Sequence, residues 1–245
     1  MSLTLYELVL SHDTDVNASP WVWAVKSDLA ILGVPYESVP MTFPEVRGKL
    51  ATDSGNNEVT CPTIKLPNNE YITDSWVIAK WLAANHDPSN KLLQGDEETA
   101  NIAPWVLQHL AGVLWFICLP TDMAGHTEPV NREYFLKNKY GNDLDQYKRD
   151  AAVLSEPAEY GPRVTKARAV IRQFEELLQS RPGKFILSDQ ASHADSIVFG
   201  WYLASAIHPT LNDKIWEGDN DTPRVSAWIK AMGEITGLKP HPPTL

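Results

Sequence analysis

The hydrophobic pattern of the chain changes near residue 90, and this change constrains the fold more than any other feature. Up to residue 86, short alternating apolar runs and short helical patterns follow one another closely. Beyond it, apolar residues recur at helical spacing almost to the end. Alternation of apolar and polar residues is typical of strands, and apolar residues three to four positions apart are typical of helices. We therefore predict a small α/β domain followed by an all-helical domain. Their expected bounds are 1–86 and 98–245, joined by a polar, proline-containing linker over 87–97.

The first domain reads as β-α-β-α-β-β-α. Ser19 followed by Pro20 opens its first helix, because serine caps free N–H groups and proline presets the first turn. Gly33 ends that helix, as glycine tolerates the left-handed conformation found there. The expected strands cover 3–8, 36–39, 59–64 and 71–72, and the expected helices cover 20–32, 43–50 and a segment that begins at 74–75.

The second domain is expected to contain helices alone. The first of these helices is long and apolar on all sides, which is typical of a buried helix. No internal repeat or low-complexity run interrupts the pattern. The expected helices cover 99–119, 128–154, 162–180, 193–207 and 223–233.

Charge and composition exclude several classes of function. The net charge of −10 disfavours nucleic acid and membrane surfaces as partners, and no apolar run approaches the ~18 residues of a membrane span. The start of the chain lacks the pattern of a signal peptide, and two cysteines 57 residues apart suit a reducing cytoplasm. The seven histidines are scattered, so we expect no metal site.

Three features of the first domain indicate a binding site. Pro62 cannot donate to a sheet, so we expect it at an edge or bulge, and Cys61–Pro62 is a candidate for a cis peptide bond. The Cys61 main chain would then pair with a peptide-like ligand. Asp74 would receive an ammonium group, and Ser75 with the N–H groups of the helix start would hold a carboxylate. Ser19, at another helix start, could donate to a thiolate and lower its pKa. A thiol, a peptide backbone and an α-amino acid end are all present in glutathione.

These segments resemble the glutathione S-transferase superfamily, and the resemblance covers essentially the whole chain. It is closest to the etherase-related branch, meaning the bacterial β-aryl etherases and the fungal-specific class. The matching segments are Leu3–Leu8, Ser19–Trp23 followed by Lys26, and Asp74–Ala79. The resemblance implies a thioredoxin-like first domain, a homodimer, and glutathione as co-substrate.

Carried over residue by residue, the resemblance places Ser19 beside the glutathione sulfur. It places Cys61 and Pro62 against the cysteinyl part, and Asp74 and Ser75 at the γ-glutamyl end. The glycyl carboxylate has no motif; its candidate residues are Lys49 and Asn57.

Two positions depart from the family pattern. Cys61 stands where the family has valine, so its thiol could form a mixed disulfide, and Ala24 stands where many relatives carry arginine. In the second domain Ser192 and Asp195 match the family's capping box, which we interpret as structural.

Two questions stay open from the sequence. Ser11 is a rival to Ser19 as the hydroxyl that donates to the glutathione sulfur, and Tyr6 on the first strand could also approach the sulfur.

The resemblance implies a hydrophobic acceptor site for aromatic electrophiles, which would undergo conjugation, peroxide reduction or aryl ether cleavage. The alternative function is a ligandin-type protein that binds phenolic compounds with little turnover, and a scaffold use of the fold is a third hypothesis. The candidate acceptor-site residues are Trp21, Trp115, Phe116 and Met123.

Overall fold

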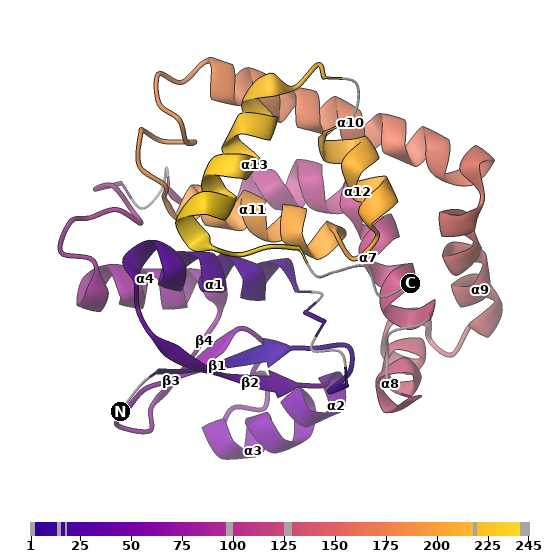
Figure 1. Cartoon of the computed structure of the whole chain (residues 1–245). Coiled ribbons are helices and arrows are strands. Elements are labelled where there is room, and N and C mark those ends of the chain that lie inside the picture. Colours follow the sequence, from indigo (N-terminus) through magenta and orange to yellow (C-terminus); the bar gives the residue numbers. More distant parts are fainter. Residues whose placement is uncertain are drawn as a thin grey trace.

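A computed structural model describes residues 3–13, 16–17, 19–96, 100–124, 129–217 and 220–240; for 119–124 it describes the main chain alone. Figure 1 shows a sheet with flanking helices at one end of the molecule and a larger group of helices packed against it. This arrangement confirms the predicted fold class, a thioredoxin-like α/β part followed by a helical part. The division at 87–97 remains our proposal.

The first part contains a four-stranded mixed sheet in the order β2-β1-β3-β4. β1 runs parallel to β2 and antiparallel to β3, and β3 runs antiparallel to β4. Leu5, at the centre of β1, is fully buried and pairs with Ser38 on one side and Ile64 on the other. The strands are β1 (Leu3–Leu8), β2 (Tyr36–Met41), β3 (Thr63–Lys65) and β4 (Tyr71–Thr73). The third strand is shorter than expected, because it begins only after Pro62.

Helices cover both faces of this sheet (Figure 1). On one face, α1 (Pro20–Leu32) and α4 (Ser75–His86) contact each other and enclose an apolar core with the strands. Gly33 ends α1 at φ 66°, as the sequence predicts. On the other face, α2 (Phe43–Glu45), a π-helical turn η1 (Val46–Leu50) and α3 (Ala51–Ser54) form one continuous helical segment.

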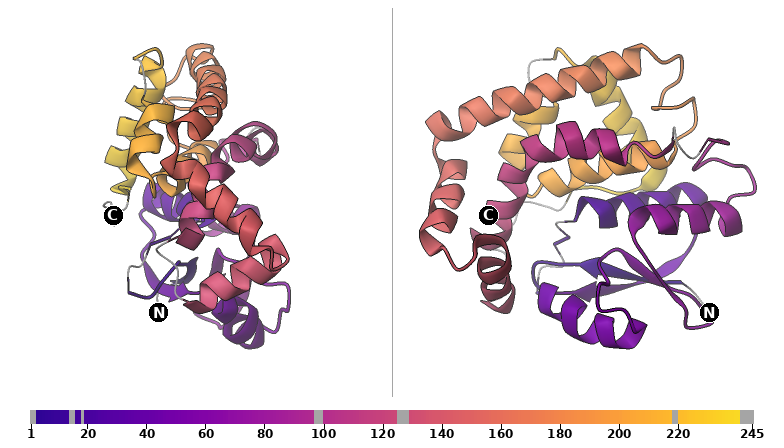
Figure 2. Two further views of the ribbon diagram at one scale, coloured as in Figure 1. Left: turned by 90° about the vertical axis from the view of Figure 1, so that its right-hand side faces the viewer. Right: turned by 180° about the vertical axis from the view of Figure 1, so that it is seen from behind.

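Every element of the second part that the structure describes is a helix, as the right-hand view of Figure 2 shows. Gly141 and Asn142 have φ of 56° and 69°, so the helix expected over 128–154 is in fact two helices. The helix expected from 162 begins at Pro157, and α12 was not predicted. The elements are α6 (Ala103–Trp105), η2 (Val106–Ala111), α7 (Gly112–Ala124), α8 (Pro129–Tyr140), α9 (Leu144–Ala152), η3 (Val153–Ser155), α10 (Pro157–Gln179), α11 (His193–Ser205), α12 (Pro209–Trp216) and α13 (Pro223–Thr236). In the described part of the chain, every helix is too short or too polar to span a bilayer.

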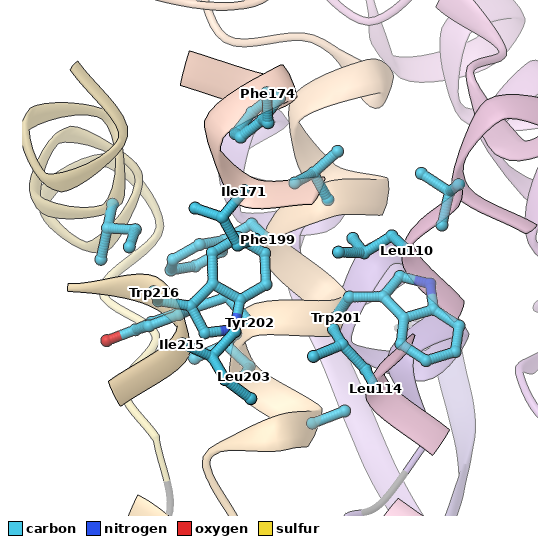
Figure 3. Packing of buried hydrophobic residues seen from close by; sticks show 14 of the residues in the cluster. Leu110, Leu114, Ile171, Phe174, Phe199, Trp201, Tyr202, Leu203, Ile215 and Trp216 are labelled. Carbon is cyan, nitrogen blue, oxygen red and sulfur yellow. The ribbon is translucent and has the colours of Figure 1, made fainter. Parts of the chain in front are cut away.

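The core of the second part surrounds α11, whose residues are all buried. Figure 3 shows aromatic side chains from this helix packed between α7, α10 and α12. The capping box at its start is present: one oxygen of Asp195 accepts hydrogen bonds from both Ser192 N and Ser192 Oγ. The same carboxylate accepts from Ile186 N and Trp228 Nε1, so it joins α11 to the preceding loop and to α13.

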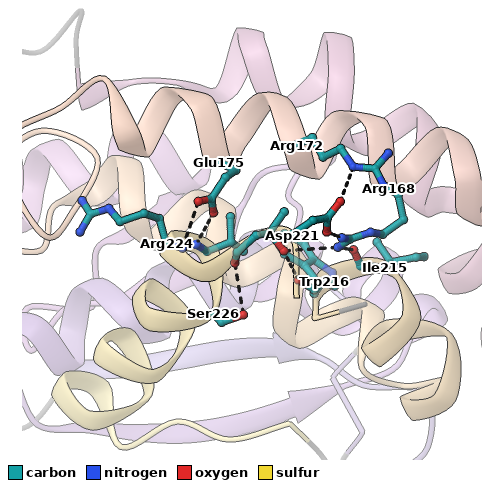
Figure 4. Close-up of polar contacts among 10 residues, drawn as sticks. Arg168, Arg172, Glu175, Ile215, Trp216, Asp221, Arg224 and Ser226 are labelled. Atoms are coloured by element: carbon teal, nitrogen blue, oxygen red, sulfur yellow. Dashed lines mark hydrogen bonds and ion pairs between the residues drawn. The ribbon is translucent and has the colours of Figure 1, made fainter. Parts of the chain in front are cut away.

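A second polar network holds α10 to the segment between α12 and α13 (Figure 4). The buried Arg168 donates to the Ile215 carbonyl at 2.9 Å and pairs with Asp221, which also accepts from Arg172. The Glu175 carboxylate accepts from the main chain at the start of α13. These bonds satisfy polar groups that burial would otherwise leave unpaired.

The two parts meet where α1 packs against α11. A Cβ atom at Gly200 would lie 2.2 Å from the Pro20 carbonyl oxygen and 3.0 Å from the Ala24 nitrogen, so the two helices approach at backbone distance. Ala24 is fully buried in this contact. A buried pair adds to the contact: Asp28 on α1 lies 2.7 Å from His193 Nδ1.

Gly200→Ala is expected to destabilise the fold. The added methyl group must separate two backbones, and overpacking of this kind costs about 2 kcal/mol. Urea denaturation measures the difference. The matched control is Gly112→Ala at the start of α7, where φ is −60°, a Cβ meets nothing within 4 Å and alanine favours the helix. Equal stability of the two variants would contradict the close approach of α1 and α11.

Candidate functional site

A cavity of about 690 Å³ opens where the first part faces α7 and α8. Its lining combines flat aromatic side chains with hydroxyl, thiol and cationic groups. The residues from the first part are Leu8, Ser19, Pro20, Trp21, Phe43, Val46, Arg47, Thr60 and Cys61, and those from the second part are Trp115, Tyr134, Phe135 and Lys139.

Ser19 lies at this cavity as the N-cap of α1. Its Oγ accepts a hydrogen bond from Val22 N at 3.3 Å, while its own N–H donates to Asn17 Oδ1 at 2.9 Å. Because Oγ serves as the acceptor in the cap, its hydrogen is available to donate to a ligand. The positive end of the α1 dipole lies at the same place and favours a negative charge there.

The rival donors do not line the cavity. Ser11 is buried, and its Oγ accepts from Asp13 N at 3.1 Å. Tyr6 stacks on Tyr71 with ring centroids 6.0 Å apart. Burial and the neighbouring Tyr71 hydroxyl raise the pKa of Tyr6, so the phenol stays neutral. Of the three hydroxyl groups considered, the structure brings only Ser19 to the cavity.

Cys61 lines the cavity next to a cis peptide bond with Pro62. The β3 ladder begins at Thr63, so the main-chain groups of Cys61 lie outside the pairing of the sheet. Burial and the nearby Glu7 carboxylate raise the pKa of the Cys61 thiol to about 12, against the opposing effect of Arg47. The thiol is therefore protonated at neutral pH, which makes it a poor nucleophile for a mixed disulfide.

Asp74 and Ser75 lie at the start of α4, outside the cavity lining. They are connected to it through Thr73, whose Oγ1 bonds both the N–H and the carbonyl of Thr60. Asp74 has φ 81°, and its Oδ1 accepts from Trp76 N and Val77 N. This corrects the expectation of free N–H groups at this helix start, because the Asp74 carboxylate itself occupies two of them.

The two candidates for the glycyl carboxylate are not at the cavity. Lys49 is exposed and forms an ion pair with Asp53 at 2.7 Å, and Asn57 is exposed beyond α3. Arg47, which sequence reasoning missed, lines the cavity and donates to the Val59 carbonyl at 3.0 Å. Residues two apart on a helix point in roughly opposite directions. No motif shows in advance which of the two cations faces the cavity.

Of the residues predicted to form the acceptor site, some line the cavity and others do not. Trp21 and Trp115 line the cavity and pack edge-to-face on the buried Trp201, at centroid distances of 6.2 and 5.3 Å. Phe116 does not line it; this side chain is buried in the helical core beneath the Arg163 guanidinium. The side chain of Met123 lies outside the described residues.

Sequence reasoning missed the contribution of α8. Phe43 packs between Tyr134 and Phe135, at centroid distances of 5.6 and 4.5 Å. The buried Asn131 fixes α8 to the first part, because it accepts from Phe43 N and donates to the Leu10 carbonyl. The signal in the sequence was the adjacent Tyr134 and Phe135 in a helix that is polar overall.

Comparisons with known proteins agree with this architecture. Residues 18–85 match the family model described as the glutathione S-transferase N-terminal domain. The chain superposes with a TM-score of 0.73 on a glutathione S-transferase of Ceriporiopsis subvermispora in complex with glutathione, at 17% identity over 96% of this chain and 98% of that one. For a glutathione transferase of Phanerochaete chrysosporium the TM-score is 0.75, at 13% identity and coverage of 96% and 97%.

A third similar structure is glutaredoxin 2 of Salmonella typhimurium in complex with glutathione, with a TM-score of 0.68 at 15% identity over 98% of this chain and 96% of that one. Identities this low establish a shared fold and leave the reaction to the residues of the site. The chain therefore has the fold of the glutathione S-transferases throughout, and its residues 18–85 match the N-terminal domain of that family.

Proposed function

We propose that this protein is a glutathione transferase that activates the thiol of glutathione through Ser19. The observation that carries the proposal is the Ser19 hydroxyl: it caps α1 as an acceptor, its hydrogen has no acceptor among the described residues, and it lines the same cavity as Cys61 and Arg47. In a thiol transferase of the glutaredoxin type we would expect a cysteine at the position of Ser19.

Glutathione would lie along the first part. Its cysteinyl residue would pair with the Cys61 main chain beside Pro62, and its ammonium group would face the exposed Asp74 carboxylate. The Ser75 hydroxyl and N–H remain for the γ-glutamyl carboxylate. Arg47 is better placed for the glycyl carboxylate than Lys49 or Asn57, because it alone of the three lines the cavity.

The chemistry is nucleophilic attack by sulfur. A free thiol with a pKa of about 8.5 is only a few per cent ionised at pH 7. The Ser19 O–H and the α1 N-terminus stabilise the thiolate, and a decrease of about two pKa units corresponds to roughly 2.7 kcal/mol. With an aryl halide, sulfur bonds to the ring carbon and halide leaves. Peroxide reduction and aryl ether cleavage, the latter in keeping with the etherase-related branch, use the same thiolate.

The test combines binding with turnover on the full chain. Calorimetric titration is expected to show glutathione binding, and 1-chloro-2,4-dinitrobenzene is expected to be conjugated faster than in buffer at pH 7. Arg47→Met should weaken the binding of glutathione more than Lys49→Met does. Absence of glutathione binding to folded protein would end the proposal.

A ligandin-type binding protein is the second candidate, and the aromatic lining of the cavity favours it. Trp21, Trp115 and Tyr134 offer flat surfaces to phenolic compounds. Thermal-shift titration with phenols, run beside conjugation assays on a panel of electrophiles, separates the two candidates. Stabilisation by phenols without turnover of any electrophile would favour the binding protein.

We further propose, from the resemblance, a cytoplasmic homodimer in which the first domain of one subunit contacts the helical domain of the other. Light scattering in solution measures the oligomeric state directly.

A further inference from the structure

The charge of the cavity is opposite to that of the chain. The protein carries a net charge of −10. Among the described residues that line the cavity, Arg47 and Lys139 are cationic and none is acidic. Both side chains are exposed, and two cations at one cavity attract anions because their fields add there.

The two cations come from opposite sides. Arg47 lies on η1 in the first part and donates to the Val59 carbonyl. It lines the cavity together with Cys61 of the same part. Lys139 lies in the last turn of α8, in the helical part. In the described part of the chain Lys139 has no ion-pair partner. Its charge is therefore not neutralised by a neighbouring carboxylate.

Lys139 shares a face of α8 with an aromatic wall. Phe135 precedes it by four residues, a spacing that puts two side chains on the same side of a helix. Lys137, two residues away, points elsewhere and is absent from the lining. Because Asn131 bonds both Phe43 N and the Leu10 carbonyl, this face of α8 is held against the first part.

We propose that the acceptor side of the cavity selects planar aromatic compounds that carry an anionic group, with Lys139 as the residue that binds the anion. The conjugation of such compounds to glutathione rests on the proposed function, whereas their binding to the cavity does not depend on it. An aromatic ring would lie among Trp115, Tyr134 and Phe135, with its carboxylate or phenolate toward the Lys139 ammonium group. Lys139 thereby determines specificity without touching the reacting sulfur.

The test compares 4-chloro-3-nitrobenzoate with 4-chloro-3-nitrobenzamide, which have nearly the same shape and differ in charge. Binding to the full chain is measured by calorimetry in the presence of S-methylglutathione, which fills the glutathione part and cannot react. Lys139→Met is expected to weaken benzoate binding about three- to ten-fold, in the range of a partly exposed ion pair or slightly above it, and to leave the benzamide within about two-fold. Lys139→Arg should retain most of the benzoate affinity.

Lys137→Met is the matched control, since it removes the same charge from the same helix outside the cavity. Equal loss of benzoate affinity in both variants would reduce the effect to net charge and overturn the proposal. Loss in Arg47→Met but not in Lys139→Met would assign the anion to Arg47 and overturn it too. Absence of benzoate binding to the wild-type protein would have the same consequence.

Turnover of the same two compounds with glutathione separates this proposal from the proposed function. If Lys139-dependent binding is observed but neither compound loses chloride to glutathione, the selectivity stands and the transferase activity does not. If both compounds are conjugated with equal KM in wild type and Lys139→Met, the transferase stands and the charge selectivity fails.

Discussion

Asp195→Ala is expected to remove a large part of the stability of this protein. The fully buried carboxylate accepts four hydrogen bonds: from Ser192 N and Oγ, from Ile186 N and from Trp228 Nε1, at 2.7 to 2.9 Å. Alanine leaves these donors buried without partners, each at a cost of about 1–3 kcal/mol. Since such costs are not additive, we expect a decrease of about 4 kcal/mol in the free energy of unfolding, against a total of about 5–15.

The decrease corresponds to a fall in Tm of roughly 8–16 °C for a chain of this length. Asp195→Asn should also be strongly destabilised, because whichever way its amide is turned, the NH2 group faces two donors. The control is Asp143→Ala at the exposed start of α9, where the carboxylate accepts a capping hydrogen bond from Gln146 N and the expected cost is about 1 kcal/mol. Similar melting temperatures for Asp195→Ala and Asp143→Ala would contradict the joining role of Asp195.

The second large effect concerns turnover. Ser19→Ala is expected to lower kcat/KM for conjugation about ten-fold at pH values below the pKa of the bound thiol, because a rise of one unit in that pKa leaves ten times less thiolate. Without the hydroxyl, the thiolate of bound glutathione is less stable, so its pKa rises and the pH profile of kcat/KM shifts upward by about one unit. The affinity for glutathione should change little, because the other contacts that we propose for it involve Cys61, Asp74, Ser75 and Arg47.

Two variants separate this effect from the loss of a helix cap. Ser19→Thr keeps both the cap and the donor and should retain most activity and the original pH profile. Ser11→Ala removes the rival hydroxyl, which does not line the cavity, and should leave kcat/KM unchanged. If Ser19→Ala keeps the wild-type pH profile while Ser11→Ala shifts it, the sulfur donor is Ser11.

The local features of the first part could be predicted because they depend on short-range backbone chemistry. Ser19, Pro20 and Gly33 mark the ends of α1 through capping and left-handed geometry, and all three occupy the predicted positions. The Cys61–Pro62 bond is cis and Asp74 caps α4, again as the residues themselves suggested. The break between α8 and α9 depends on the positive φ of Gly141 and Asn142. It was not predicted, because it lies within a long polar run over 128–154.

Predictions of which side chains face the cavity succeeded less often, because a helical pattern does not fix the rotation of a helix about its axis. Trp115 and Phe116 are neighbours on α7, yet Trp115 lines the cavity at 38% exposure and Phe116 is buried at 9%. On η1, Arg47 lines the cavity and Lys49 does not, although both side chains are exposed.

The sequence by itself determined the order of the elements in the first part, the caps of α1 and α4 and the position of the cis proline before β3, because each depends on residues a few positions apart. Only the tertiary structure decided what forms the far wall of the cavity. Tyr134, Phe135 and Lys139 reach it because Asn131 bonds the main chain at Leu10 and Phe43, contacts that span 121 and 88 residues. Contacts over such separations follow from how the whole chain packs, and no local pattern encodes them.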